Sequence, residues 1–185
     1  MLRLAHEWRE IARVPKIRLL SGERIRDFVL SRKQEESYLA ICPQPLHGIA
    51  LLILETGLRI GEALKMEWAD VTLQPVNGAR FGFLRVREGK SKTARRIIPL
   101  TDRASGMLKP RRESQSSPYV FASREGTPYL GTSINHLHRN TFAPMVKGKL
   151  SPIFPGDFVL HSLRHTMLTR LGESGVDAFT IIRIA

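Results

Sequence analysis

The chain has 185 residues, of which 42% are hydrophobic and 25% are charged, so it is long enough and apolar enough for one domain with its own core. This composition excludes a wholly disordered chain. Lysine and arginine number 29 against 17 acidic residues, and a net charge of +12 indicates a polyanionic partner, DNA or RNA, rather than only a solvated basic surface.

Cysteine usage and hydropathy exclude several other classes of protein. Cys42 is the only cysteine, which excludes an intrachain disulfide and a cysteine-based zinc site and favours a reducing, cytoplasmic location. The longest apolar run, residues 49–54, is six residues long, whereas a membrane-spanning helix needs about 20. The N-terminus has acidic residues and lacks the apolar segment of a signal peptide. We therefore expect no membrane partner.

The N-terminal part of the chain differs in pattern from the rest. Residues 1–28 mix Arg and Lys with Pro and Gly and show no sustained periodicity, which predicts a basic linker or arm in front of a domain over residues 29–185. Ser31 followed three residues later by Gln34 is a capping box. A first helix is therefore expected over residues 31–41.

Two more helices and a change of period follow. Helices are expected over residues 46–55 and 59–67, with Gly57 between them able to adopt the left-handed turn that ends a helix. Residues 80–99 then alternate in character with a period of two around the basic turn GKSKTA, which predicts a β-hairpin. The two sides of its first strand are Phe81, Phe83, Arg85 and Arg87 on one and Gly82, Leu84 and Val86 on the other.

The second half of the chain is expected to be mostly helical. The remaining elements, in order, are a helix over 102–109 capped by Thr101, a polar loop, a short YVFAS strand, a helix from a cap at Thr132 or Ser133 to Phe142, a loop over 148–157, a helix from about His161, and a last helix capped by Asp177. The predicted fold class is thus mainly α with a small antiparallel β-hairpin or sheet.

Three stretches carry candidate chemistry. They are ETGLRIGEALKMEW with Arg59 and Glu62, the hairpin GKSKTARRIIPL with Lys90, Lys92, Arg95 and Arg96, and HSLRH with His161, Arg164 and His165. The order Arg, then Lys on a hairpin, then His-x-x-Arg resembles the catalytic domain of the tyrosine recombinases, the phage integrase family, over about residues 29–185.

The resemblance implies the tyrosine-recombinase catalytic fold and site-specific DNA recombination or integration. In that reaction a tyrosine hydroxyl attacks a phosphodiester, leaves a 3′-phosphotyrosine and a free 5′-hydroxyl, and a second 5′-hydroxyl reverses the step. The implied partners are double-stranded DNA and other copies of the chain, which form tetramers on paired DNA sites in full-length members. No cofactor is expected, and the resemblance implies a bacterial or phage-encoded protein.

Each candidate residue has a role that suits its chemistry. Guanidinium is always charged and fits phosphate, so Arg59 and Arg164 are expected to clamp the phosphate in the transition state. His161 shares a helix face with Arg164 and can relay a proton or donate to a phosphate oxygen. Glu62 matches an acidic position of the family that helps to orient the site. His165 is expected to pack behind these groups.

The hairpin lysine that protonates the departing 5′-oxygen has two candidates. Lys92 precedes a threonine and lies seven residues before Pro99, which matches the family best, and Lys90 is the alternative. The lysine without that role, together with Arg95 and Arg96, is expected to contact DNA phosphates.

Two histidine pairs raise the question of a metal. His161 and His165 form an HxxxH pattern that could bind zinc in a metal hydrolase, but the glutamate of the protease motif and a third ligand are absent. His136 and His138 are two residues apart and cannot face the same side of a helix, so one is expected to be exposed near DNA and the other packed. No metal is expected.

Two functional positions of the family have no match in the sequence. The family's further histidine and its nucleophilic tyrosine would fall after residue 185, and none of Tyr38, Tyr119 and Tyr129 occupies the nucleophile's position. The sequence therefore predicts a catalytic domain truncated before its nucleophile, which binds DNA without cleaving it. The alternative is a non-catalytic DNA-binding protein derived from an integrase.

Overall fold

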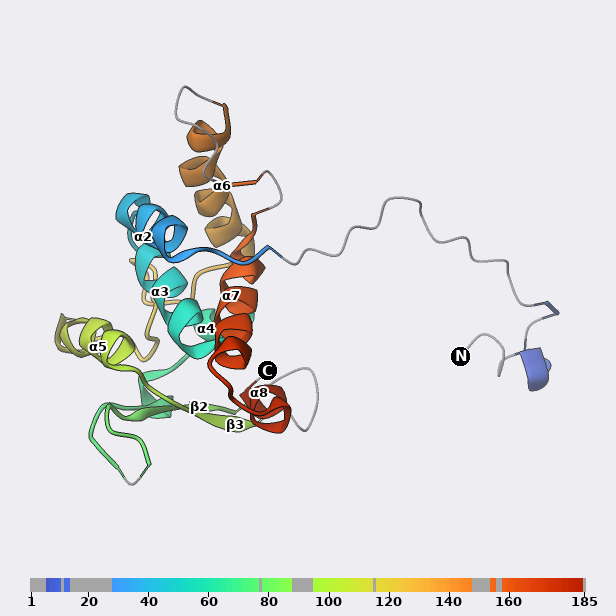
Figure 1. Cartoon of the computed structure of the whole chain (residues 1–185), viewed down its shortest axis with the longest axis horizontal. Helices are drawn as coiled ribbons and strands as arrows, with labels where there is room; N and C mark the ends of the chain where they lie inside the picture. Colours follow the sequence, from blue (N-terminus) through green and yellow to red (C-terminus); the bar gives the residue numbers. More distant parts are fainter. Residues whose placement is uncertain are drawn as a thin grey trace.

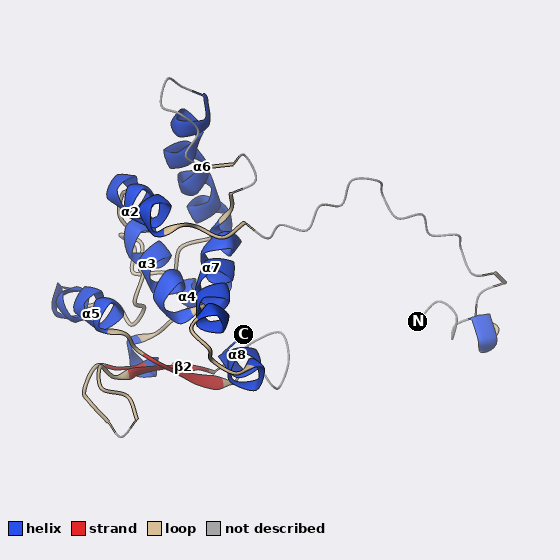
Figure 2. Ribbon diagram, in the orientation of Figure 1, coloured by secondary structure: helices blue, strands red, loops and turns tan. Residues whose placement is uncertain are grey.

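A computed structural model describes residues 6–10, 12–13, 28–76, 78–87, 95–114, 116–147, 154–155 and 158–184. In chain order, the elements are α2 (Arg32–Ile41), α3 (Leu46–Thr56), α4 (Ile60–Leu64), the 3-10 helix η1 (Trp68–Asp70), β1 (Val71–Thr72), β2 (Phe83–Val86), β3 (Arg96–Pro99), α5 (Asp102–Ser114), α6 (Gly131–Lys147), α7 (Leu160–Glu173) and α8 (Ala178–Ile184). The helices form one body with a small sheet along one side, which confirms the predicted fold class (Figures 1 and 2).

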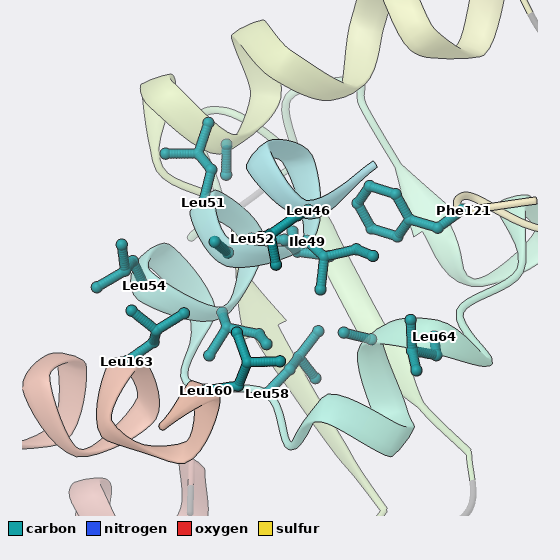
Figure 3. Close-up of a cluster of buried hydrophobic side chains, with 14 of the residues drawn as sticks. Leu46, Ile49, Leu51, Leu52, Leu54, Leu58, Leu64, Phe121, Leu160 and Leu163 are labelled. Atoms are coloured by element: carbon teal, nitrogen blue, oxygen red, sulfur yellow. The ribbon is translucent and has the colours of Figure 1, made fainter. Parts of the chain in front are cut away.

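Helix α3 is the centre of the helical body. Nine of its 11 residues are buried, so it is apolar on every side and must be surrounded. It contacts α2, α4, α5, α6 and α7. Figure 3 shows its leucines packed toward Leu160 and Leu163 of α7 and toward Phe121. This packing fixes α4 and α7, which carry most of the candidate site, relative to one another.

The turn between α3 and α4 is the predicted glycine turn. Gly57 adopts the left-handed conformation, with φ of 65°, and its N–H donates to the Ile53 carbonyl at 2.8 Å. A Cβ at this position would lie 2.9 Å from the Met167 sulfur of α7. Glycine is therefore needed both for the turn and for the close approach of α7.

The sheet has the order β1-β2-β3 and is antiparallel throughout. In β2 the side chains of Leu84 and Val86 are buried and that of Arg85 is exposed, which confirms the predicted hairpin and its alternation. Strand β1 was not predicted, because two residues are too few to show a period. Gly82 has φ of 91°, and a Cβ there would lie 1.9 Å from the Thr72 carbonyl oxygen, so only glycine lets the chains approach.

The third predicted helix is shorter than expected, and the YVFAS strand is not formed. Helix α4 ends at Leu64 rather than near Glu67, because the following residues pair with a distant segment. The Trp68 N–H donates to the Pro118 carbonyl at 2.8 Å, and the Val120 N–H donates to the Met66 carbonyl at 2.8 Å. Residues 119–123 thus form isolated bridges instead of a strand.

Two other predicted boundaries were wrong. Helix α5 continues to Ser114 through Pro110 instead of ending at 109. Its last turn is held by tertiary contacts, since the Arg111 guanidinium stacks on the Phe121 ring at 4.8 Å and donates to Gln44 at 3.0 Å. Helix α6 begins at Gly131, so neither Thr132 nor Ser133 is its cap, and it ends at Lys147 rather than at Phe142.

The other predicted helix starts were correct. Ser31 and Gln34 form the capping box of α2, Thr101 accepts from the Ala104 N–H at 3.1 Å, and Asp177 accepts from the Thr180 N–H at 3.0 Å. Helix α7 begins one residue before His161, as expected. Of the predicted loop over 148–157, only residues 154–155 are described. In the described part of the chain, every helix is too short or too polar to cross a bilayer.

Candidate functional site

Three elements bring the candidate residues together. Arg59 and Glu62 lie at the N-terminus of α4, Arg96 is the first residue of β3, and His161 and Arg164 lie in the first turns of α7. We call these five residues the arginine cluster. These residues are close together because α4 and α7 both pack on α3, and because the sheet that carries Arg96 lies along one side of the helical body (Figure 1).

The first half of the cluster is a capping arrangement. Arg59 is the N-cap residue of α4, and its backbone N–H donates to Glu62 Oε2 at 2.8 Å. Its guanidinium Nη1 donates to Glu62 Oε1 at 3.2 Å. The Arg59 side chain remains 47% exposed, whereas that of Glu62 is 9% exposed. Glu62 thus fixes the backbone and the side chain of an arginine that still reaches solvent.

Arg96 contacts the same carboxylate from the sheet. Its Nη1 donates to Glu62 Oε1 at 3.1 Å and its Nη2 donates to Oε2 at 2.7 Å, which is a bidentate pair. Burial opposes ionisation of Glu62, but the hydrogen bonds from Arg96 and Arg59 hold its pKa below the usual value for a glutamate. Glu62 is therefore charged at neutral pH.

Arg164 is the buried cation of the cluster. Its residue is 5% exposed, and its Nη1 donates to the Gly57 carbonyl, at the turn that leads to Arg59. Burial lowers the pKa of Arg164 to about 10; the charges of Arg59 and Arg96 act in the same direction, and Glu62 acts against them. Arg164 is still protonated at neutral pH, but it is held among other positive charges.

His161 is the exposed member of the cluster on α7. Its ring lies edge-on to that of His165, with 4.7 Å between centroids. Partial burial and the positive charges of His165, Arg164 and Arg59 lower the pKa of His161 below the usual value for a histidine. His161 is therefore neutral at neutral pH and can accept a proton. His165 is half-buried.

Further cationic side chains line two clefts beside the arginine cluster. The first, of about 750 Å³, is lined by residues of α4, of β2 and of neighbouring loops, among them Arg59, Glu62, Lys65, Arg85, Arg87 and Tyr119. The second, of about 400 Å³, is lined by Arg85, Val86, Arg87, Arg95, Arg96 and Ile97. Sequence reasoning had assigned no role to Lys65, Arg85 or Arg87, although the alternation along β2 already placed Arg85 and Arg87 on one side.

The remaining predicted residues lie apart from the cluster or outside the described residues. Lys90 and Lys92 both lie outside the described residues, so the choice between them stays a prediction. His138 is buried, with Nδ1 2.7 Å from the Tyr38 hydroxyl and Nε2 3.2 Å from the Phe158 carbonyl, whereas His136 is exposed. That confirms the expected split of the pair. The described residues contain no group of three or more metal-ligating side chains.

The charge balance of the arginine cluster determines what it can bind. The guanidinium groups of Arg59, Arg96 and Arg164 surround one carboxylate, and their mutual repulsion contributes to the lowered pKa of Arg164. An anion placed against Arg59 and Arg164 would relieve that repulsion, and guanidinium forks match the oxygens of a phosphate or sulfate group. With a neutral histidine beside them, these residues can hold an oxyanion and exchange a proton with it.

Comparison with known proteins identifies the family of the chain. The sequence pattern of the phage integrase family matches residues 29–184. The integrase of Salmonella phage P22 is 25% identical over 180 residues, which are 95% of this chain and 45% of that protein. The chain thus spans less than half the length of that relative.

Solved structures with the same fold are recombinases. The Tn1549 transposon integrase, in complex with circular intermediate DNA, superposes with a TM-score of 0.75 at 18% identity, over 89% of this chain and 60% of that one. A lambda integrase tetramer bound to a Holliday junction gives a TM-score of 0.66 at 20% identity, over 89% of this chain and 48% of that one. The chain belongs to the phage integrase family, and its fold is that of a tyrosine-recombinase catalytic domain.

Proposed function

We propose that this chain is the phosphate-binding part of a site-specific DNA recombinase and that the arginine cluster binds the scissile phosphate of double-stranded DNA. The observation that carries the proposal is the excess of positive charge around Glu62, where Arg164 is buried and Arg59 is half-exposed. A surface arginine has no need of such surroundings, whereas a site for an anion does.

The proposed chemistry follows from the charges of the cluster. Attack of a tyrosine hydroxyl on the phosphodiester adds negative charge to the non-bridging oxygens, and Arg59 and Arg164 are placed to neutralise it. Fixed donors of this kind contribute about 3 kcal/mol each to the transition state. His161, which is neutral at neutral pH, takes up or returns the proton of the attacking hydroxyl. Lys92, or alternatively Lys90, protonates the departing 5′-oxygen.

The rest of the basic surface is proposed to contact the DNA backbone. Lys65 and Arg85 line the first cleft, together with Glu67 and Asp70, and Arg85 and Arg95 both line the second, so further cations lie between Arg59 and the sheet. Phosphate contacts of this kind set affinity and position without reading sequence. Residues 1–28 are proposed to form a basic arm before the domain. The chain is proposed to work in a bacterial cytoplasm, as a tetramer on paired DNA sites, the state in which lambda integrase binds a Holliday junction.

We also propose that the 185-residue polypeptide binds DNA without cleaving it. Tyr38 is fully buried, its hydroxyl is hydrogen-bonded to His138, and burial raises its pKa. Tyr129 packs against the core. Tyr119 lines the first cleft, but the residues that line this cleft include neither His161 nor Arg164. We therefore expect none of these hydroxyls to act as the nucleophile.

The test combines binding with trapping of a covalent intermediate. Fluorescence anisotropy on a labelled duplex should show binding that weakens at least about tenfold between roughly 50 and 200 mM salt, because bound phosphates release counterions. A nicked suicide substrate should give no covalent adduct with this polypeptide. An adduct that disappears in Tyr119→Phe would contradict the proposal and identify Tyr119 as the nucleophile. Absence of salt-dependent binding would contradict the whole assignment.

The alternative, a non-catalytic DNA-binding protein derived from an integrase, predicts the same binding by this polypeptide. The two differ in the protein made from the natural reading frame that contains this sequence. A covalent adduct between that protein and the suicide substrate supports the recombinase, and binding without an adduct supports the alternative.

A further inference from the structure

We propose that Arg96 is a positioning residue, which holds Arg59 in place through the shared carboxylate of Glu62. The inference rests on the proposed function only for the group that Arg59 is held to meet, a DNA phosphate. It differs from the role that the sequence suggests for Arg96, which is a direct phosphate contact.

The carboxylate of Glu62 is shared evenly between the two arginines. Oε1 accepts from Arg59 Nη1 at 3.2 Å and from Arg96 Nη1 at 3.1 Å. Oε2 accepts from the Arg59 backbone N–H at 2.8 Å and from Arg96 Nη2 at 2.7 Å. A carboxylate has about four acceptor positions, so these four bonds fill them. Each oxygen is fixed from both sides, and loss of Arg96 would leave Glu62 tied to Arg59 alone.

Burial separates the tasks of the two arginines. The side chain of Arg96 is 7% exposed and that of Glu62 is 9% exposed, whereas that of Arg59 is 47% exposed. The two terminal nitrogens of Arg96 are engaged by Glu62 away from solvent, so this guanidinium would have to break its bidentate pair to meet a phosphate directly. Arg59 meets solvent while it stays bonded to Glu62. The group presented to DNA is therefore Arg59, and the group that braces it is Arg96.

The ion pair between Arg96 and Glu62 connects two parts of the fold that are distant in the sequence. Arg96 begins β3 and pairs with Val86 of β2, while Glu62 lies in the first turn of α4, 34 residues earlier. The link from Arg96 to Glu62 therefore ties the hairpin to the N-terminus of α4. It keeps the first turn of α4, and with it Arg59, at a fixed place relative to the sheet.

The first experiment observes Arg59 directly and needs no DNA. In the folded chain, the Nε–H signal of Arg59 is followed by 15N NMR and assigned by its absence in Arg59→Gln. Arg96→Gln should shift this signal and speed its exchange with water, and Arg96→Lys, which keeps the charge but lacks the fork, should restore it only in part. The matched control is Arg95→Gln, at the exposed neighbouring position, which should leave the signal unchanged. An unchanged Arg59 signal in folded Arg96→Gln would overturn the proposal.

The second experiment is a double-mutant cycle on DNA affinity. Arg59→Gln should weaken binding on the order of tenfold, Arg96→Gln by a few-fold, and the double variant no more than Arg59→Gln alone, since Arg96 acts through Arg59. Losses that multiply in the double variant would show that Arg96 contacts DNA itself and would overturn the positioning role. If the unmodified chain does not bind DNA, the proposed function fails, and the NMR experiment still decides whether Arg96 braces Arg59.

Discussion

The side chains of Glu35 and Glu62 are both largely shielded from solvent, and each accepts hydrogen bonds from two arginines, but their surroundings differ in charge. Glu35 lies in α2 and bonds Arg103 of α5 and Arg170 of α7. Arg103 is shared with a second carboxylate, Glu55 of α3, at 3.1 Å. Arg170 also donates to the backbone carbonyl at residue 30, at 2.8 Å. The exposed Arg32 also pairs with Glu35, at 3.7 Å, so three arginines share the carboxylates of Glu35 and Glu55.

The arginine cluster around Glu62 differs in composition. There, the carboxylate of Glu62 bonds Arg59 and Arg96, and its charge also supports that of Arg164. The two glutamates themselves do not reveal the difference. In both cases burial opposes the charged form and the arginines outweigh it, so the pKa of each lies below the usual value.

The pKa values of the arginines do differ between the two regions. Burial alone would lower the pKa of Arg103, but Glu35 and Glu55 raise it above the usual value. Burial and its cationic neighbours lower the pKa of Arg164 instead, to about 10. The Glu35 network is complete without a ligand and serves to hold α2, α5 and α7 together. The lowered pKa of Arg164 fits the anion site that we propose at the arginine cluster.

The largest expected effect tests whether the network around Glu35 stabilises the fold. Glu35→Gln leaves Arg170 without its carboxylate partner and Arg103 with Glu55 alone, and loss of one member of a buried ion pair costs about 3 kcal/mol of unfolding free energy when its partners are partly exposed. Urea unfolding at pH 7 should show that loss, and the folded variant should keep its affinity for DNA. A loss under about 1 kcal/mol would mean that the network contributes little, as exposed ion pairs do.

The pH dependence of the same variant supplies a control. Because the pKa of Glu35 is lowered in the folded state, the folded protein binds fewer protons than the unfolded chain, and the stabilisation is present above the unfolded pKa near 4.5. It is lost as the pH falls through the folded value. The gap in unfolding free energy between the native chain and Glu35→Gln should therefore be full at neutral pH and shrink below about pH 4.5.

The two regions also differ in how far the sequence predicts them. The capping pair Ser31 and Gln34 and the glycine turn at Gly57 are local signals, and the structure has both. Nothing local marks Glu35, because its partners Arg103 and Arg170 lie 68 and 135 residues away. The end of α4 was missed for the same reason, since it is set by pairing with residues 118–120.

For the candidate site, the types and order of the residues predicted which of them act together. The sequence did not predict which of them are buried. Arg59, His161 and Arg164 were expected to act together, and the fold does bring them together. The sequence grouped Arg95 with Arg96 as two equivalent basic residues on a strand. The pleat makes Arg95 exposed and turns Arg96 toward Glu62, a distinction that requires the position of α4 relative to the sheet.

A smaller effect tests whether the arginine cluster binds an anion. Sulfate added at constant ionic strength should stabilise the native chain against thermal unfolding by about 1 kcal/mol at roughly five times its dissociation constant, because it binds the folded cluster. Arg59→Gln should lose most of this stabilisation. Arg103→Gln, which removes a cation from the Glu35 network, should keep it. Equal stabilisation in all three proteins would show only the general exclusion of sulfate from protein surfaces and would contradict an anion site at the cluster.

The smallest expected effect concerns protonation of His161. Its pKa is lowered by burial and by the cations around it, so it is neutral at pH 7 and gains a proton as the pH falls. A bound anion favours the charged imidazole, so sulfate affinity should rise about two- to threefold between pH 7.5 and 5.5, or about 0.5 kcal/mol. His161→Gln should flatten the profile, while His165→Gln, which changes the half-buried neighbour, should keep most of it. A profile unaffected by His161→Gln would remove this histidine from the anion site and assign the proton exchange to another group.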